Sequence, residues 1–207
     1  MKNGTLSMTI VCVLMSMFTG CMSLGAAKSS QTRFFLLVSK PDSMVSNASV
    51  FGLADTAVGI GPVTIPDYLD RPQLITRLEG SELRVNEFRQ WAEPLRDNIT
   101  RVLEENLAAL TGANQVHAIP LHRSAEIDLQ VVLDILQFDG AANGQVTLKA
   151  VWRIIDPEGY KTLKEKRSTL QYPSNGSRTT DVVEAMSAAL FELSQEIAGG
   201  LDDLAQR

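Results

Sequence analysis

The sequence predicts an α+β fold, in which a mostly antiparallel sheet carries two amphipathic helices packed on one face. Apolar and polar residues alternate over residues 127–135 and 145–155, a pattern typical of half-buried strands. Over residues 95–110 and 182–197 the apolar residues recur about every 3.6 positions, as on the buried face of a helix. The strands come in runs that a helix interrupts, and this order favours α+β over an alternating α/β fold.

The first 20 residues predict an export signal peptide. Lys2 provides a short positive region, and residues 8–18 form an apolar run that is shorter than the roughly 20 residues of a transmembrane helix. The run ends in the letters FTGC, which resemble the lipobox of bacterial lipoproteins with Phe18 in place of the usual leucine. We therefore expect cleavage before Cys21 and lipidation of its thiol; a plain secretory signal cut near this point is the alternative.

The cysteine content agrees with lipidation. Cys12 lies in the signal, so Cys21 would be the only cysteine of the exported chain, in a compartment where a free thiol is a liability. Residues 21–32 are small and polar, which predicts a flexible tether with a reach of about 18 Å. Residues 33–207 are then expected to form a single domain close to the membrane surface.

The charge of the exported chain excludes two classes of partner. Lys2 is the only charged residue of the signal, so its removal changes the net charge from −5 to −6. Such mild acidity argues against nucleic acid as a partner and against a polybasic membrane-binding surface.

The first strands are marked by short apolar runs. Residues 33–39 (RFFLLVS) predict a buried strand, and residues 40–56 predict a loop. Residues 58–65 are rich in β-branched residues, but Gly61 and Pro62 interrupt them, which predicts a strand with a bulge or at an edge of the sheet. Residues 67–73 predict a loop, and residues 74–78 and 82–86 predict a hairpin. Residues 127–135, 145–155 and 163–172 predict three antiparallel strands in a meander.

Both helices carry signals at their ends. Pro94 stands where a helix can open, and Gly112 stands where its C-terminal cap belongs. Thr180 or Asp181 would cap the second helix at its N-terminus, and the glycines at residues 199–200 predict that it ends or frays there.

The residues that could carry chemistry are few. His117 and His122 are separated by five positions, a spacing that fits neither a helical metal pair nor a zinc finger. No serine stands in a nucleophile elbow, and Gly59 and Gly61 lack the third glycine and the helix of a dinucleotide site. The sequence therefore predicts no catalytic site, no metal and no cofactor.

A turn-rich segment with large side chains is the strongest candidate for a binding surface. Tyr68, Leu69 and Arg71 lie between Pro66 and Pro72, so we expect a rigid loop that presents an aromatic residue and a forked donor, as anchors at protein interfaces do. Trp91 is added to this partner-binding set, although burial in the core is the more probable role for a tryptophan. In the alternative interpretation, polar residues of the loop only tie it to its own domain.

These segments carry a family resemblance. The runs GPVTIPDYLDRPQLITR and ELRVNEFRQWAEPLRDNITRVLEENLAAL resemble the PqiC/YmbA family of ABC-type transport auxiliary lipoproteins. The resemblance covers nearly the whole exported chain, from the FFLL run to the last helix. It implies a lipoprotein that faces the periplasm and works with a membrane-spanning MCE-domain protein in a system that moves lipids between the two membranes. Met22 rather than an aspartate after Cys21 fits retention in the outer membrane under the family's sorting rule.

The sequence leaves three functions open. The first is a non-enzymatic docking or adaptor subunit, expected to be a cyclic homo-oligomer because MCE partners form symmetric tubes that a ring can close. The second is a periplasmic shuttle or exit cup that binds a phospholipid itself; a periplasmic hydrolase is a remote third. A large apolar cavity would favour the shuttle, and an exposed surface around Tyr68 would favour the adaptor.

Overall fold

The structure is a computed structural model that describes residues 31–40, 53, 55–113, 115–119, 126–158 and 160–206. Thr32–Arg207 form one compact unit. The signal peptide, Cys21, His122 and nearly all of the tether and of the loop expected at residues 40–56 lie outside the described residues.

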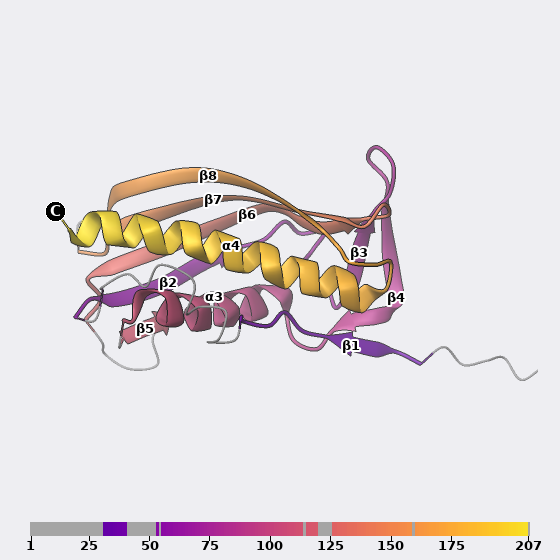
Figure 1. Ribbon diagram of the computed structural model, residues 1–207, viewed down its shortest axis with the longest axis horizontal. Helices are drawn as coiled ribbons and strands as arrows, with labels where there is room; N and C mark the ends of the chain where they lie inside the picture. The colour runs from indigo at the N-terminus through magenta and orange to yellow at the C-terminus, as the bar shows by residue number, and fades with distance from the viewer. Residues whose placement is uncertain are drawn as a thin grey trace, which may run out of the picture. The chain divides into compact units, whose positions relative to one another are not determined.

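Eight strands form one mixed sheet, and two helices cover it, which confirms the α+β prediction (Figure 1). The elements are β1 (Arg33–Phe35), β2 (Ala57–Thr64), β3 (Gln73–Arg77), β4 (Leu83–Trp91), α3 (Leu95–Thr111), β5 (Gln115–Ala118), β6 (Leu129–Ala141), β7 (Gln145–Asp156), β8 (Lys161–Pro173) and α4 (Thr179–Ala205). The predicted hairpin and meander are the antiparallel pairs β3–β4, β6–β7 and β7–β8. Parallel pairs join β1 to β4, β2 to β5 and β6, and β3 to β6.

Both helices lie on the same face of the sheet, where α4 runs along β6, β7 and β8 and α3 covers β2 and β5 (Figure 1). The side chains that alternate on β7 point into this layer and are fully buried, as the sequence predicted: Val146, Leu148, Ala150, Trp152 and Ile154. The apolar faces of both helices complete the same core. Burial of this area is the main stabilising term of the fold.

Helix α4 does not end at the two glycines, so that part of the prediction is wrong. The helix continues to Ala205, and Gly200 lies inside it where the ring of Trp152 packs against the backbone. A Cβ atom at Gly200 would lie 2.8 Å from Cη2 of Trp152, closer than van der Waals contact allows. The glycine therefore serves the contact between helix and sheet rather than a helix end.

The first strand is shorter and less buried than the sequence predicted. Only Arg33–Phe35 pair with β4, at an edge of the sheet. Phe35 and Leu37 are buried, whereas Phe34, Leu36 and Val38 are exposed. An apolar run thus formed an edge strand with one open face, because its outer side chains find no covering layer.

Strand β2 confirms the predicted bulge. Its register with β6 shifts between Ile60 and Val63, but the strand lies inside the sheet between β5 and β6. Strand β5 was not predicted from the sequence. It has four residues, and of these only Val116 is buried, so it carries too short a pattern to detect.

Candidate functional site

The docking loop, as we call residues 66–72, connects β2 to β3 in a tight turn. The amide of Leu69 donates to the carbonyl of Pro66 at 2.9 Å, and the amide of Arg71 donates to the carbonyl of Leu69 at 2.8 Å. These bonds, with the φ angles that Pro66 and Pro72 fix, restrain the backbone as the sequence predicted.

Tyr68 ties the docking loop to the sheet. Its hydroxyl donates a 2.9 Å hydrogen bond to Oδ2 of Asp139, a β6 residue whose side chain is 1 % exposed. Arg77 on β3 donates to both oxygens of the same carboxylate, at 2.7 and 3.1 Å, and its guanidinium lies 5.9 Å from the centre of the Tyr68 ring. The buried carboxylate is thereby paired, as a charge out of water must be.

The ionisation of this cluster is stable around neutral pH. Burial, and next the negative charge of Asp139, raise the pKa of Tyr68 to about 12. The hydrogen bond to Asp139 is the main cause that raises the pKa of Arg77. Tyr68 therefore keeps its proton and Arg77 its charge, and the docking loop stays fixed.

Two of the expected contact residues are buried. Leu69 is 3 % exposed and belongs to the core, so the expectation that the loop presents it is wrong. The proline-flanked turn directs its side chain inward, which composition alone does not reveal. Trp91 is 7 % exposed and also belongs to the core, the role that was favoured for it.

Asp70 and Arg71 form the outer side of the docking loop. Asp70 makes a 2.6 Å ion pair with Arg96, in which both side chains are nearly half exposed. The side chain of Arg71 is exposed and makes no hydrogen bond or ion pair with any described residue. Asp70 thus ties the loop to its own domain, whereas Arg71 does not.

A surface hollow joins the docking loop to the segment that begins at Trp91. It has a volume of about 310 Å³ and is lined by Asp70, Arg71, Pro72 and residues 91–95. The two segments that stood out in the sequence therefore share one surface. The buried Trp91 and the exposed Arg71 both line it.

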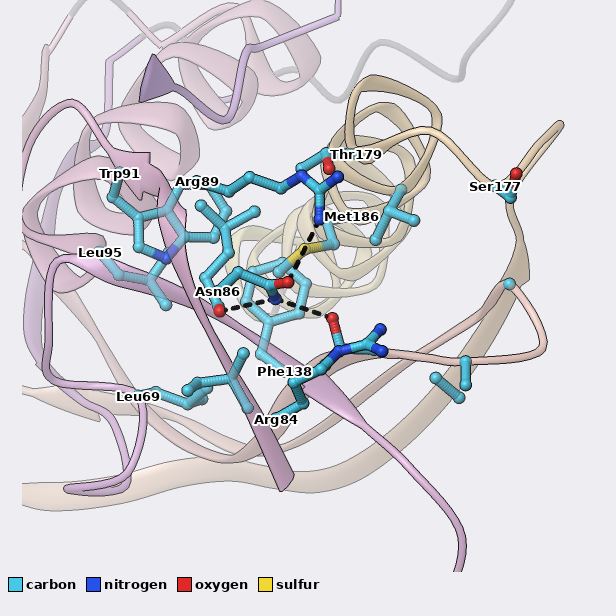
Figure 2. A pocket seen from close by; sticks show the side chains of 17 residues that line it. Leu69, Arg84, Asn86, Arg89, Trp91, Leu95, Phe138, Ser177, Thr179 and Met186 are labelled. Atoms are coloured by element: carbon cyan, nitrogen blue, oxygen red, sulfur yellow. Dashed lines mark hydrogen bonds between the residues drawn. The ribbon is translucent and has the colours of Figure 1, made fainter. Parts of the chain in front are cut away.

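A second pocket lies between the β3–β4 hairpin, the turn after β6 and the start of α4, and we call it the hairpin pocket (Figure 2). Its volume is about 100 Å³. Apolar side chains line its base, among them Leu69, Leu74, Trp91, Phe138 and Met186. Polar side chains from β4 and from the start of α4 line its mouth, namely Arg84, Asn86, Arg89, Ser177 and Thr179.

A bulge in β4 brings its polar residues to this pocket. Leu74 of β3 pairs with Asn86, but the preceding residue, Gln73, pairs with Gln90, so β4 has extra residues between these two points. The shift puts Asn86 and Arg89 on the same side of the strand, although they are three positions apart (Figure 2). Strict alternation would place them on opposite faces, which is why the sequence did not reveal this set.

Asn86 organises the mouth of the hairpin pocket. Its amide nitrogen donates to the carbonyl of Leu74 at 2.9 Å and to Oγ1 of Thr76 at 3.0 Å. Its amide oxygen accepts a 3.3 Å hydrogen bond from Nη1 of Arg89. Figure 2 shows Arg84 and Arg89 entering the pocket from β4 on either side of this amide.

Metal sites and membrane-spanning helices are considered for the described part of the chain. His117 lies half-buried on β5, and no group of three potential metal ligands forms within the described ranges. In the same ranges, no helix combines the length and the apolar character that crossing a membrane requires.

The fold resembles that of two crystal structures. One is of a protein from Xanthomonas campestris, with a TM-score of 0.70, 15% sequence identity and coverage of 84% of this chain and 97% of that one. The other is of an uncharacterized protein, with a TM-score of 0.67, 16% identity and coverage of 83% and 99%. At such identities the likeness concerns the fold alone. No curated protein sequence matches this chain.

The sequence model of one family matches residues 37–198, which include the docking loop, residues 91–95, α3, most of α4 and the lining of the hairpin pocket. That match covers well over half of the chain and agrees with the resemblance found in the sequence. The chain therefore belongs to the family of ABC-type transport auxiliary lipoprotein components.

Proposed function

We propose that this protein is an outer-membrane lipoprotein that serves as a non-enzymatic docking subunit of an MCE-type intermembrane lipid transport system. Its partner is the membrane-spanning MCE-domain protein of that system. The observation that carries the proposal is the docking surface formed by the docking loop and residues 91–95. There a fixed backbone presents Arg71, which has no ion-pair partner among the described residues, beside a hollow. A rigid surface of this kind loses little conformational entropy on binding.

The pockets of the described residues favour docking over a lipid shuttle, because the hairpin pocket is small and the larger hollows, of about 310–380 Å³, are open at the surface. Pockets that enclose drug-sized ligands have volumes of about 300–1,000 Å³. The hairpin pocket has about 100 Å³, too little for the acyl chains of a phospholipid. The hollow beside Arg71 is larger, but it is an open surface feature.

Anchoring through Cys21 is part of the proposal. It is supported by the lipobox-like FTGC letters, by the position of Cys21 as the only cysteine after the signal, and by membership in a lipoprotein family. The intact mass of the protein extracted from membranes tests it. A chain that begins at another residue, or that carries no acyl mass on Cys21, would contradict lipidation.

A cyclic homo-oligomer is the assembly we propose. A symmetric ring presents one docking surface per subunit to the end of a symmetric tube, so weak contacts act together. Native mass measurement of the Cys21→Ser protein, alone and with the MCE-domain partner, tests this. A strictly monomeric protein in both samples would contradict it.

A paired measurement tests the docking surface. We expect Arg71→Ala to weaken assembly with the partner by a factor of about 30, the effect of losing roughly 2 kcal/mol at an interface anchor. Its thermal midpoint should not change, because the exposed Arg71 side chain makes no hydrogen bond or ion pair with a described residue. Arg167→Ala is the matched control, because Arg167 of β8 is also exposed and has no ion pair with a residue that the structure describes. Normal assembly of Arg71→Ala would reject the docking surface.

A further inference from the structure

The hairpin pocket is positively charged, although the chain as a whole is acidic. Two of its lining residues, Arg84 and Arg89, are cationic, and none is acidic. This holds in a chain whose net charge is −5. A pocket with an apolar base and only positive charge at its mouth is complementary to an anionic group attached to an apolar one.

The arginines at the pocket have no carboxylate partner. No described carboxylate lies within ion-pair distance of Arg84 or Arg89, whereas Arg77, Arg96, Arg101, Arg153 and Arg178 each have one. Arg89 donates to the neutral amide of Asn86, which fixes one side of its guanidinium, and its other donors have no partner among the described residues.

A third arginine, Arg33, lies on the strand next to the pocket but is not among its lining residues, and its guanidinium lies 5.7 Å from the centre of the Phe35 ring. Arg33 of β1 stands in direct register with Arg89 of β4 in a parallel pair. Like charges at directly opposed positions destabilise a sheet, and here no described acid compensates them. An anion bound between them would remove the repulsion.

We propose that the hairpin pocket binds a phosphate ester, and specifically the phosphodiester of an anionic phospholipid headgroup. The guanidinium groups of Arg84 and Arg89 bind the phosphate oxygens, since planar forked donors match phosphate geometry. Leu74, Phe138 and Met186 contact the first apolar atoms below it. A volume of about 100 Å³ admits a headgroup and leaves the acyl chains outside.

The position of the chain's anchor fits a lipid as the source of the phosphate. Arg33, beside the pocket, is only 12 positions after Cys21 in the sequence. A tether of this length reaches about 18 Å, so the lipidation proposed for Cys21 would hold this end of the domain near headgroups. In this respect the inference rests on the proposed function, but the pocket's affinity for phosphate does not.

The test uses the exported chain with Cys21→Ser, so that binding cannot come from the lipid anchor or from the MCE-domain partner. Calorimetric titration with inorganic phosphate and with glycerophosphate measures the pocket alone. Flotation with phosphatidylcholine vesicles, with and without phosphatidylglycerol, measures the lipid source. The variants are Arg84→Gln and Arg89→Gln, and Arg167→Gln on β8 is the control with the same change of charge.

We expect glycerophosphate binding and flotation with phosphatidylglycerol vesicles to weaken by about tenfold or more in each pocket variant, since each loses charge-assisted hydrogen bonds. Arg167→Gln should behave like the parent protein, and no variant should have a lower thermal midpoint, because the substituted side chains are exposed and Arg89→Gln also removes the repulsion from Arg33. Binding of the soluble phosphates without flotation would overturn the lipid source. Absence of both, or an equal loss in Arg167→Gln, would overturn the pocket. Neither failure bears on the lipid at Cys21 or on docking to the partner.

Discussion

Arg77 and Asp139 form an ion pair in which the carboxylate side chain is 1 % exposed and the guanidinium 29 %. The pair joins β3 to β6, and its carboxylate accepts a hydrogen bond from the hydroxyl of Tyr68, so it fixes the docking loop to the sheet. Asp70 and Arg96 form a second pair at the same loop, with both side chains nearly half exposed. The two pairs differ in burial and in hydrogen bonding, because Arg77 donates to both oxygens of Asp139 whereas Arg96 donates to one oxygen of Asp70.

Arg77→Ala should lower the free energy of unfolding by about 3 kcal/mol, because it leaves a buried carboxylate without its cation. Arg96→Ala should lower it by at most about 1 kcal/mol, the range for exposed pairs. Urea unfolding of both variants checks this. Equal losses would show that burial of Asp139 does not control the stability of the loop.

Tyr68→Phe should lower the free energy of unfolding by about 1–2 kcal/mol at neutral pH, since it removes one hydrogen bond to a charged group. The loss should disappear in strong base. The pKa of Tyr68 is about 12 in the folded chain and 10.0 for an unperturbed tyrosine, as in the unfolded chain. Between pH 10 and pH 12 the unfolded chain therefore loses the proton first, and the stability of the folded chain falls as pH rises. Below pH 10 the contribution is complete. A pH series of unfolding for both proteins tests this, and parallel curves from pH 10 to 12 would refute the assignment.

Gly200→Ala should destabilise the fold by about 1–3 kcal/mol, because the new Cβ meets the ring of Trp152 at 2.8 Å. The ring cannot move aside easily, since it is fully buried and its Nε1 donates to Ser168 at 3.1 Å. Gly199→Ala, at a partly exposed position of the same helix, is the control and should gain up to about 1 kcal/mol from helix propensity. A stabilised Gly200→Ala protein would show that α4 does not pack on Trp152 in this way.

Asn98→Ala should release the segment that follows β1. The buried Asn98 side chain accepts a hydrogen bond from the amide of Leu37 at 2.7 Å and donates one to the carbonyl of Leu37 at 3.1 Å. It thereby pairs the two backbone groups that a neighbouring strand would otherwise pair. Its loss leaves both backbone groups unpaired, at a cost of about 2–4 kcal/mol. Hydrogen exchange at Leu37 should become faster, whereas Thr100→Ala, on the outer side of the same helix, should leave it unchanged. Unaltered protection of Leu37 in Asn98→Ala would contradict this role.

The fold could be predicted where one segment carries its own periodic pattern. The buried positions of β7 and the N-terminal proline and C-terminal glycine of α3 were read from neighbouring residues alone. The parallel pairs could not be predicted, because they join strands that are distant in sequence. Gly200 misled the prediction because a glycine that ends a helix and one that admits a tryptophan ring look the same in a sequence.

The site was predicted in part for the same reason. Loop chemistry indicated the turn between Pro66 and Pro72, and the hollow that joins it to Trp91 lies where the two unusual segments meet. The inward direction of Leu69 depends on packing, and the set of Arg84, Asn86 and Arg89 depends on a bulge in β4. Neither leaves a pattern in the residues themselves.

Purification of the intact lipoprotein from envelope membranes, with identification of the proteins that accompany it, tests the docking role most directly. We expect a membrane-spanning MCE-domain protein to co-purify with the parent chain and with Arg167→Ala, and to be depleted about thirtyfold with Arg71→Ala at equal yield of folded lipoprotein. A parent chain that purifies without any MCE-domain protein, or Arg71→Ala retaining it in full, would contradict the proposed docking subunit.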